Sequence, residues 1–179
     1  PSQDCKKASD DIDSPNTGGM GAIAPVPWVM GDLLLTIDET ITRPALSNLK
    51  RESKVFMGCF YPGIKVMPYG LPVALECNGR FGDPETPTYM ALLESDLFEV
   101  LHACATGNLS DIRLRWEDGF AVCVVLASEG YGYRPNPTVG KVIYGIREAE
   151  KLPGVTIFPA GTKKIDGILY TSGRRVLCV

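Results

Sequence analysis

The sequence predicts an α+β fold, in which an antiparallel sheet with helices is followed by a small, mostly-β domain. In two stretches of the first two thirds, apolar residues recur every three or four positions, as in helices that pack on a core. Short strand-forming segments, separated by glycine- and proline-containing turns, lie between these helices and fill the last third. The pattern changes between Asn108 and Gly119, which predicts two domains at residues 1–115 and 116–179.

The first elements are a loop and a helical stretch. Asp10–Gly21 is polar and rich in glycine, so we expect a loop there. From Val29 to Arg51 the apolar residues follow helical spacing and predict one face packed on a core. Pro44 lies inside this stretch, where it predicts a kink or a junction between two helices.

Three short segments rich in strand formers come next. They are Val55–Tyr61, Ile64–Met67 and Leu71–Asn78, separated by Pro62-Gly63 and Tyr69-Gly70. Such spacing is typical of antiparallel strands joined by turns.

A second helix is predicted between Thr86 and Gly107. Thr86 is a suitable N-cap and Pro87 suits the first helical position, while Gly107 suits the end of the helix. A new N-cap is available at Ser95-Asp96, where we expect a break.

The remaining chain alternates strand formers with tight turns. Asp166-Gly167 is the expected hairpin turn. The strand candidates are Phe120–Ala127, Lys141–Tyr144, Val155–Ala160, Ile168–Thr171 and Arg175–Val179.

Composition narrows the class of protein. The 179 residues are 45% apolar and 22% charged, which is ordinary for a soluble globular protein. A net charge of −3 without a run of Lys or Arg argues against a nucleic-acid or membrane partner. The longest apolar run, Phe120–Ala127, is far shorter than a membrane helix, and there is no secretion signal. We therefore expect a cytoplasmic protein that acts on small molecules.

Cysteine and histidine do not suggest a catalytic centre. The six cysteines form no Cys-x-x-Cys pair and are expected to be buried free thiols. The single histidine, His102, lies in a helical stretch without a neighbouring nucleophile. A Ser-His or Cys-His hydrolase is therefore not expected.

The most informative polar residues follow one another near the end of the Leu71–Asn78 strand. Alternate side chains of a strand share a face, so Glu76 and Asn78 are expected to project together, about 7 Å apart. A carboxylate and an amide oxygen suit a hard cation such as Mg²⁺ that also binds water and phosphate. Arg80 follows on the same side and is placed to contact that phosphate.

Beyond this pair the chain leads into the predicted N-terminus of a helix through Asp83 and Glu85, where free amides favour an anion. From spacing alone an alternative stays open: Glu76 and Asn78 can be the solvated face of an edge strand, with Asp83 and Glu85 as helix caps. The glycine-rich stretch Asn16–Gly21 offers amides for phosphate or carboxylate, although a flexible turn explains it equally well.

Several motifs in order resemble the glycinamide ribonucleotide synthetase family, an ATP-grasp family, over essentially the whole chain from Gln3 to Val179. They are Pro-Asn-Thr-Gly-Gly-Met-Gly-Ala at 15–22, Glu-x-Asn-x-Arg-Phe-Gly-Asp-Pro-Glu at 76–85, Ser-Asp-Leu at 95–97, Ala-Gly-Thr at 160–162 and Gly-Arg-x-Val-Leu-Cys-Val at 173–179. The resemblance implies that residues 1–115 are the C-terminal part of an ATP-grasp domain and that residues 116–179 are a truncated C-terminal β domain.

The resemblance also implies a reaction, in which glycine is joined to 5-phosphoribosylamine with ATP as co-substrate, through an acyl phosphate of glycine. It implies that Glu76 and Asn78 bind Mg²⁺ or Mn²⁺ and that Arg80, Asp83 and Glu85 are catalytic. The substrate-binding residues that it implies are Asp4, Lys6, Asn16, Thr17, Gly18, Gly19, Met20 and Gly21.

Some features argue against an active isolated chain. Cys5, Pro87 and Gly132 depart from the family pattern. The nucleotide-like domain and the ATP-holding lobe with which such enzymes open have no counterpart before Pro1, so a missing N-terminal part is expected as a partner. The alternative is a non-catalytic or degenerate ATP-grasp-derived module with a binding or structural role, which the presence of Glu76 and Asn78 disfavours.

Overall fold

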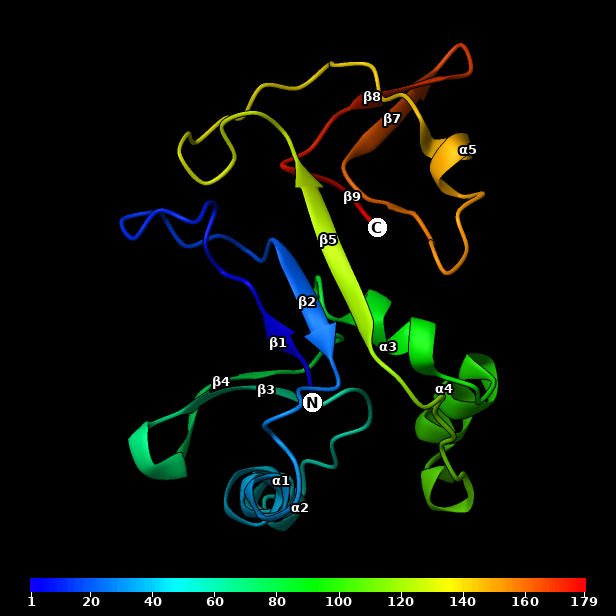
Figure 1. Cartoon of the computed structure of the whole chain (residues 1–179). Coiled ribbons are helices and arrows are strands. Elements are labelled where there is room, and N and C mark those ends of the chain that lie inside the picture. The colour runs from blue at the N-terminus through cyan, green and yellow to red at the C-terminus, as the bar shows by residue number, and fades with distance from the viewer. The chain divides into compact units, whose positions relative to one another are not determined.

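A computed structural model describes all residues from Pro1 to Val179 (Figure 1). The chain forms two compact units, and each is drawn from separate stretches of sequence. Unit 1 comprises Pro1, Pro25–Gly82 and Leu92–Gly119, and unit 2 comprises Ser2–Ala24, Asp83–Ala91 and Phe120–Val179. Helices and antiparallel sheets are both present, which confirms the predicted α+β class. The predicted domain boundary between residues 115 and 116 stays a prediction.

The first helical stretch of unit 1 is continuous but irregular. α1 (Asp32–Ile37) runs into the π-helical turn η1 (Asp38–Thr42) and then into α2 (Arg43–Arg51). The wide turn ends where the Arg43 N–H donates to the Asp38 carbonyl, immediately before Pro44. Proline has no N–H to donate and its ring crowds the preceding turn. The irregularity expected at Pro44 is therefore a π-helical turn within one helical run.

Unit 1 also contains a two-stranded antiparallel ribbon. β3 (Tyr61–Val66) pairs with β4 (Pro72–Asn78), and the short helix η2 (Pro68–Gly70) joins them. The predicted turn at Pro62-Gly63 is wrong, because both residues lie in β3, and Val55–Phe60 is not a strand. Proline is tolerated on an edge strand, and the register shifts at Gly63, where a glycine permits a bulge.

The predicted second helix is divided as expected. α3 (Thr86–Leu92) and α4 (Leu97–Thr106) are separate, and the Asp96 side chain caps α4 by accepting a hydrogen bond from the Glu99 N–H. Gly107 ends α4 with a φ of 77°, a conformation that glycine adopts without strain. The short helix η3 (Leu109–Asp111) follows.

Unit 2 is built on an antiparallel sheet with the strand order β1-β2-β5-β9-β6. The bounds are Gln3–Asp4, Gly21–Ala24, Ala121–Ala127, Arg175–Cys178 and Phe158–Pro159 in that order. In Figure 1, β1, β2 and β5 lie side by side. Cys123 and Val125 of β5 are buried against Cys178 and form the core of this sheet. No local pattern predicts β1 and β2, which are short and flank a glycine-rich loop.

A hairpin of β7 (Thr162–Ile165) and β8 (Ile168–Thr171) completes unit 2. Its turn is the predicted Asp166-Gly167, with φ values of 48° and 83°. α5 (Ile146–Ala149) is only four residues long, so the C-terminal region is rich in strands, as predicted. Lys141–Tyr144 forms only an isolated bridge instead of the expected strand. None of the helices has the length and apolar character needed to cross a membrane.

Candidate functional site

Glu76 and Asn78 share one face of β4, in unit 1. The Asn78 Nδ2 donates a hydrogen bond of 3.1 Å to Glu76 Oε1, so the prediction that the two side chains project together is confirmed. Gly63 lies opposite Glu76 in β3, and a Cβ there would lie only 2.9 Å from Glu76 Cγ. The glycine therefore leaves the space that the Glu76 side chain occupies.

The donor set of this pair fits a hard divalent cation. Glu76 is exposed, and the Asn78 amide needs only to rotate for its Oδ1 to face the same point as the carboxylate. No group of three or more His, Cys, Asp or Glu is placed to hold a metal ion. A cation at this pair would thus have two protein oxygens and keep its other positions for water and phosphate, as Mg²⁺ commonly does.

Arg80 extends from the same end of the ribbon. It is exposed, and its guanidinium donates a 2.9 Å hydrogen bond to the Phe81 carbonyl. This single bond to a neighbouring carbonyl leaves other N–H groups of the fork free to bind an oxyanion.

The glycine-rich stretch lies in unit 2, and its amides are already hydrogen-bonded. The bonds are Thr17 N–H to the Lys6 carbonyl (2.7 Å), Gly18 N–H to Tyr131 Oη (3.0 Å), Gly19 N–H to Thr17 Oγ1 (3.0 Å) and Met20 N–H to the Cys5 carbonyl (2.8 Å). The sequence alone predicts amides that are available to a phosphate or a carboxylate here. The structure instead shows a fixed loop, in which Asn16 and Gly18 are exposed.

Within unit 2 the glycine-rich stretch contacts the Asp-Pro-Glu segment at residues 83–85. A Cβ on Gly19 would lie 2.4 Å from Pro84 Cδ and 2.8 Å from Asp4 Oδ1. The φ of Gly19 is +118°, which an L side chain rarely adopts. Two of the sequence motifs are therefore adjacent in space, and their contact requires glycine at position 19.

Arg175, the first residue of β9, joins the same two segments. Its NH1 donates to the carbonyls of Gly18 (3.0 Å) and Asp83 (2.9 Å), and its NH2 donates to Asp83 Oδ2 (2.7 Å). Arg175 is not among the site residues predicted from the sequence, although it lies in the motif at 173–179. Nothing in local spacing indicates that this side chain reaches residues so distant in sequence.

Two acidic residues of unit 2 are buried. The Asp4 side chain is 9% exposed, and Lys6 Nζ lies 2.5 Å from its Oδ2, whereas Oδ1 has no hydrogen-bond partner. Glu85 precedes α3 and is 6% exposed. Burial raises the pKa of Asp4; the Glu85 charge acts in the same direction, and Lys6 and Arg175 oppose it. A buried carboxylate oxygen without a donor favours a nearby cation or N–H group.

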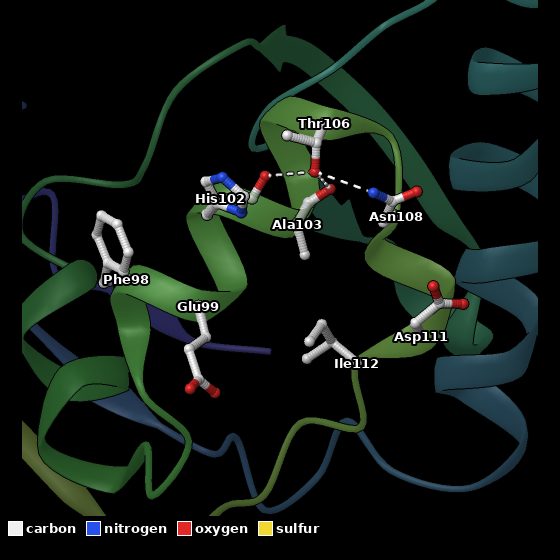
Figure 2. A pocket seen from close by; sticks show the side chains of 8 residues that line it. All are labelled: Phe98, Glu99, His102, Ala103, Thr106, Asn108, Asp111 and Ile112. Carbon is white, nitrogen blue, oxygen red and sulfur yellow. Dashed lines mark hydrogen bonds between the residues drawn. The ribbon is translucent and has the colours of Figure 1, made fainter.

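The structure also contains a surface hollow of about 290 Å³ in unit 1, between α4 and η3. Figure 2 shows its lining, in which Thr106 Oγ1 bonds to the carbonyls of His102 and Ala103 and accepts from Asn108 Nδ2. These hydrogen bonds lie at the C-terminal end of α4. None of the predicted site residues lines this hollow.

Two family models match the chain. Phosphoribosylglycinamide synthetase, ATP-grasp (A) domain, matches residues 1–86. Phosphoribosylglycinamide synthetase, C domain, matches residues 121–179. Together they cover the segments that contain every predicted site residue.

Individual proteins agree with these matches. A phosphoribosylamine-glycine ligase of Mycobacterium tuberculosis is 46% identical over 100% of this chain and 41% of its own length. A trifunctional purine biosynthetic protein adenosine-3 of Gallus gallus is 44% identical over 100% of this chain and 18% of its length. The crystal structure of a phosphoribosylamine-glycine ligase from Thermotoga maritima matches with a TM-score of 0.78 and 34% identity, over 99% of this chain and 42% of that one. The chain thus spans about two fifths of the length of the ligases that it matches.

Proposed function

The chain belongs to the phosphoribosylglycinamide synthetase family, and from that premise we propose that it forms part of an ATP-dependent carbon–nitrogen ligase. The proposed substrates are glycine, 5-phosphoribosylamine and ATP, and the product is glycinamide ribonucleotide, an intermediate of de novo purine synthesis. The observation that carries the proposal is the Glu76–Asn78 pair, which lies on one face of β4 and precedes Arg80.

The reaction has two steps. A carboxylate oxygen of glycine first attacks the γ-phosphorus of ATP, and the bond to the bridging oxygen breaks to release ADP. The amine of phosphoribosylamine then attacks the carbonyl carbon of the glycyl phosphate, loses a proton and displaces phosphate. Both steps pass through states with excess negative charge on the phosphoryl oxygens, so fixed cationic groups nearby accelerate them.

The ribbon of unit 1 supports the first step. Glu76 and Asn78 would hold Mg²⁺ or Mn²⁺, which when bound neutralises charge on the phosphate oxygens. Arg80 is exposed and offers a planar fork of N–H donors to the phosphoryl group that moves from ATP to glycine. Gly63 contributes indirectly, because the space above it admits the Glu76 side chain.

Unit 2 supplies the residues proposed to bind the amino acid and the amine. The Asp83 side chain is 64% exposed although it is paired with Arg175, so it is accessible to a substrate ammonium group. Asp4, Lys6, Glu85 and the Asn16–Gly21 loop belong to the same unit. Because the amides of the loop and the hydroxyl of Thr17 are occupied, we assign the contribution of the loop to its fixed shape and to the exposed side chain of Asn16.

The complete reaction requires groups that hold ATP, which we assign to the part of the relatives that this chain does not match. We propose a cytoplasmic location, where purine precursors are made. The test is phosphate release that depends on both glycine and phosphoribosylamine, when the chain is mixed with that remaining part. A mixture that is active but indifferent to Glu76 would instead favour a non-catalytic module.

A further inference from the structure

Arg175 makes three hydrogen bonds to two segments that are distant from it in sequence. Its guanidinium donates at 3.0 Å to the Gly18 carbonyl, at 2.9 Å to the Asp83 carbonyl and at 2.7 Å to Asp83 Oδ2. Its side chain is only 23% exposed. The residue starts β9, next to β5 in the sheet (Figure 1), so its backbone is fixed by strand pairing.

The backbone of Gly18 is held at both its N–H and its carbonyl. Tyr131 Oη accepts from the Gly18 N–H at 3.0 Å, and Arg175 donates to the Gly18 carbonyl. A Cβ on Gly18 would lie 3.5 Å from the guanidinium carbon, so the loop backbone packs directly on the Arg175 fork. Hydrogen bonds to a charged donor are stronger than neutral ones and keep the orientation of the peptide fixed.

Lysine cannot reproduce this arrangement. The guanidinium is planar and presents several N–H groups in one fork. A single side chain therefore bonds at once to the Gly18 carbonyl, the Asp83 carbonyl and Asp83 Oδ2. A lysine ammonium group is a point charge. It can pair with the Asp83 carboxylate, but it does not also bond to the Gly18 carbonyl.

We propose that Arg175 is a positioning residue, which fixes the Asp83 carboxylate and the Gly18 peptide relative to each other so that they bind the amino-acid or amine substrate. The inference rests on the proposed function for the identity of the substrate. It rests on geometry alone for the coupling of the loop to Asp83, and the two parts are tested separately.

The first measurement needs no catalysis. Amide hydrogen exchange of Gly18 and Gly19 is followed by NMR in the 179-residue chain and in its R175M and R175K variants. The matched control is R174M, which removes the neighbouring arginine whose NH2 donates to the Pro135 carbonyl at 3.0 Å. We expect R175M to speed exchange at both glycines about tenfold or more, with less than about a twofold effect of R174M, because only R175M removes a charged hydrogen bond to the loop, the one to the Gly18 carbonyl. Equal effects of R175M and R174M, or none, would overturn the proposal.

The second measurement uses the ligase mixture of the chain with the remaining part of a relative. R175M should raise the KM for glycine or for phosphoribosylamine about tenfold, while the KM for ATP stays within about twofold, and R175K should recover part of the loss. A purely structural role would lower activity without this selectivity and would contradict the proposal. If the wild-type mixture is inactive, the proposed function fails, and hydrogen exchange alone decides whether Arg175 couples the loop to Asp83. If R175M does not fold, R175K replaces it: it keeps the charge but lacks the planar fork, so it should raise the same KM selectively by a smaller factor, and an R175K variant with unchanged KM values would overturn the proposal.

Discussion

Gly19 packs against Pro84 so closely that a Cβ on the glycine would lie 2.4 Å from Pro84 Cδ. This contact brings the glycine-rich loop against the Asp-Pro-Glu segment at residues 83–85 within unit 2. Gly18, the adjacent residue, is less confined, because a Cβ there would meet Tyr131 Oη at 3.2 Å and its φ is not positive. The two neighbouring glycines therefore form a matched pair for mutation.

Gly19→Ala should lower the free energy of unfolding by about 2 to 4 kcal/mol, since it combines an unfavourable φ with a clash that Pro84 cannot relieve by rotation. Gly18→Ala should cost less than about 1 kcal/mol, because the hydroxyl of Tyr131 can move by the few tenths of an ångström required. Urea unfolding of both variants measures the difference. Equal stability of the two variants would show that the loop is not packed on Pro84 as described.

Gly63→Ala should weaken cation binding at the Glu76–Asn78 pair. A Cβ at position 63 would displace the Glu76 side chain, which it would approach to 2.9 Å, and displaced ligand supports commonly cost about tenfold in metal affinity. The measurement is Mn²⁺ binding followed by electron paramagnetic resonance. Gly79→Ala is the control, because its Cβ would meet Phe56 at an ordinary 3.5 Å. A Gly63→Ala variant that binds Mn²⁺ as tightly as Gly79→Ala would contradict the assigned site.

The buried Asp4 carboxyl predicts a pH-dependent effect of its removal. Burial raises its pKa above the ordinary 3.8, so the folded chain binds more protons than the unfolded chain between the two pKa values. Its contribution to stability is therefore complete below about pH 3.8 and is lost as the pH rises through the folded pKa. Asn at this position carries no titrating group. The stability of Asp4→Asn relative to the wild type should thus increase with pH.

Urea unfolding at several pH values between about 4 and 7 checks this expectation. Asp10→Asn serves as the control, because Asp10 is an exposed residue of the same N-terminal region. The account requires a change in the relative stability of Asp4→Asn that Asp10→Asn does not share. A relative stability that falls as the pH rises would mean that the Lys6 ion pair outweighs burial.

Asp96→Ala should destabilise the start of α4. The Asp96 carboxylate accepts a 3.1 Å hydrogen bond from the Glu99 N–H, and loss of such a cap costs about 1 kcal/mol. Asp96→Asn should retain most of the stability, since its amide oxygen also caps. Glu117→Ala, at an exposed position of the same unit, should have almost no effect. Thermal unfolding of the three variants decides whether the cap contributes as expected.

Features set by local chemistry were predictable from the sequence. The side-by-side placement of Glu76 and Asn78 follows from the two-residue period of a strand, and the Asp166-Gly167 turn follows from the φ values that these residues tolerate. The break at Asp96 likewise depends only on neighbouring residues.

Features set by tertiary contact were not predictable. Pro62-Gly63 has the composition of a turn, yet pairing with β4 holds both residues in a strand. The contact of Arg175 with Asp83 joins residues from distant parts of the sequence, and no local pattern indicates it. The occupied amide of Gly18 also depends on an acceptor placed by the fold, the hydroxyl of Tyr131.

The most direct test of the account is a ligase assay in which the chain is mixed with the part of the Mycobacterium tuberculosis enzyme that it does not match. Phosphate release should require both glycine and phosphoribosylamine, should persist with Glu52→Gln, and should fall by about a hundredfold or more with Glu76→Gln, since that variant loses the carboxylate proposed to bind the cation. Glu52 is an exposed residue paired with Lys54 and lies outside the proposed site. Equal activity of the Glu76→Gln and Glu52→Gln mixtures would contradict the claim that this chain supplies the metal-binding part of the ligase.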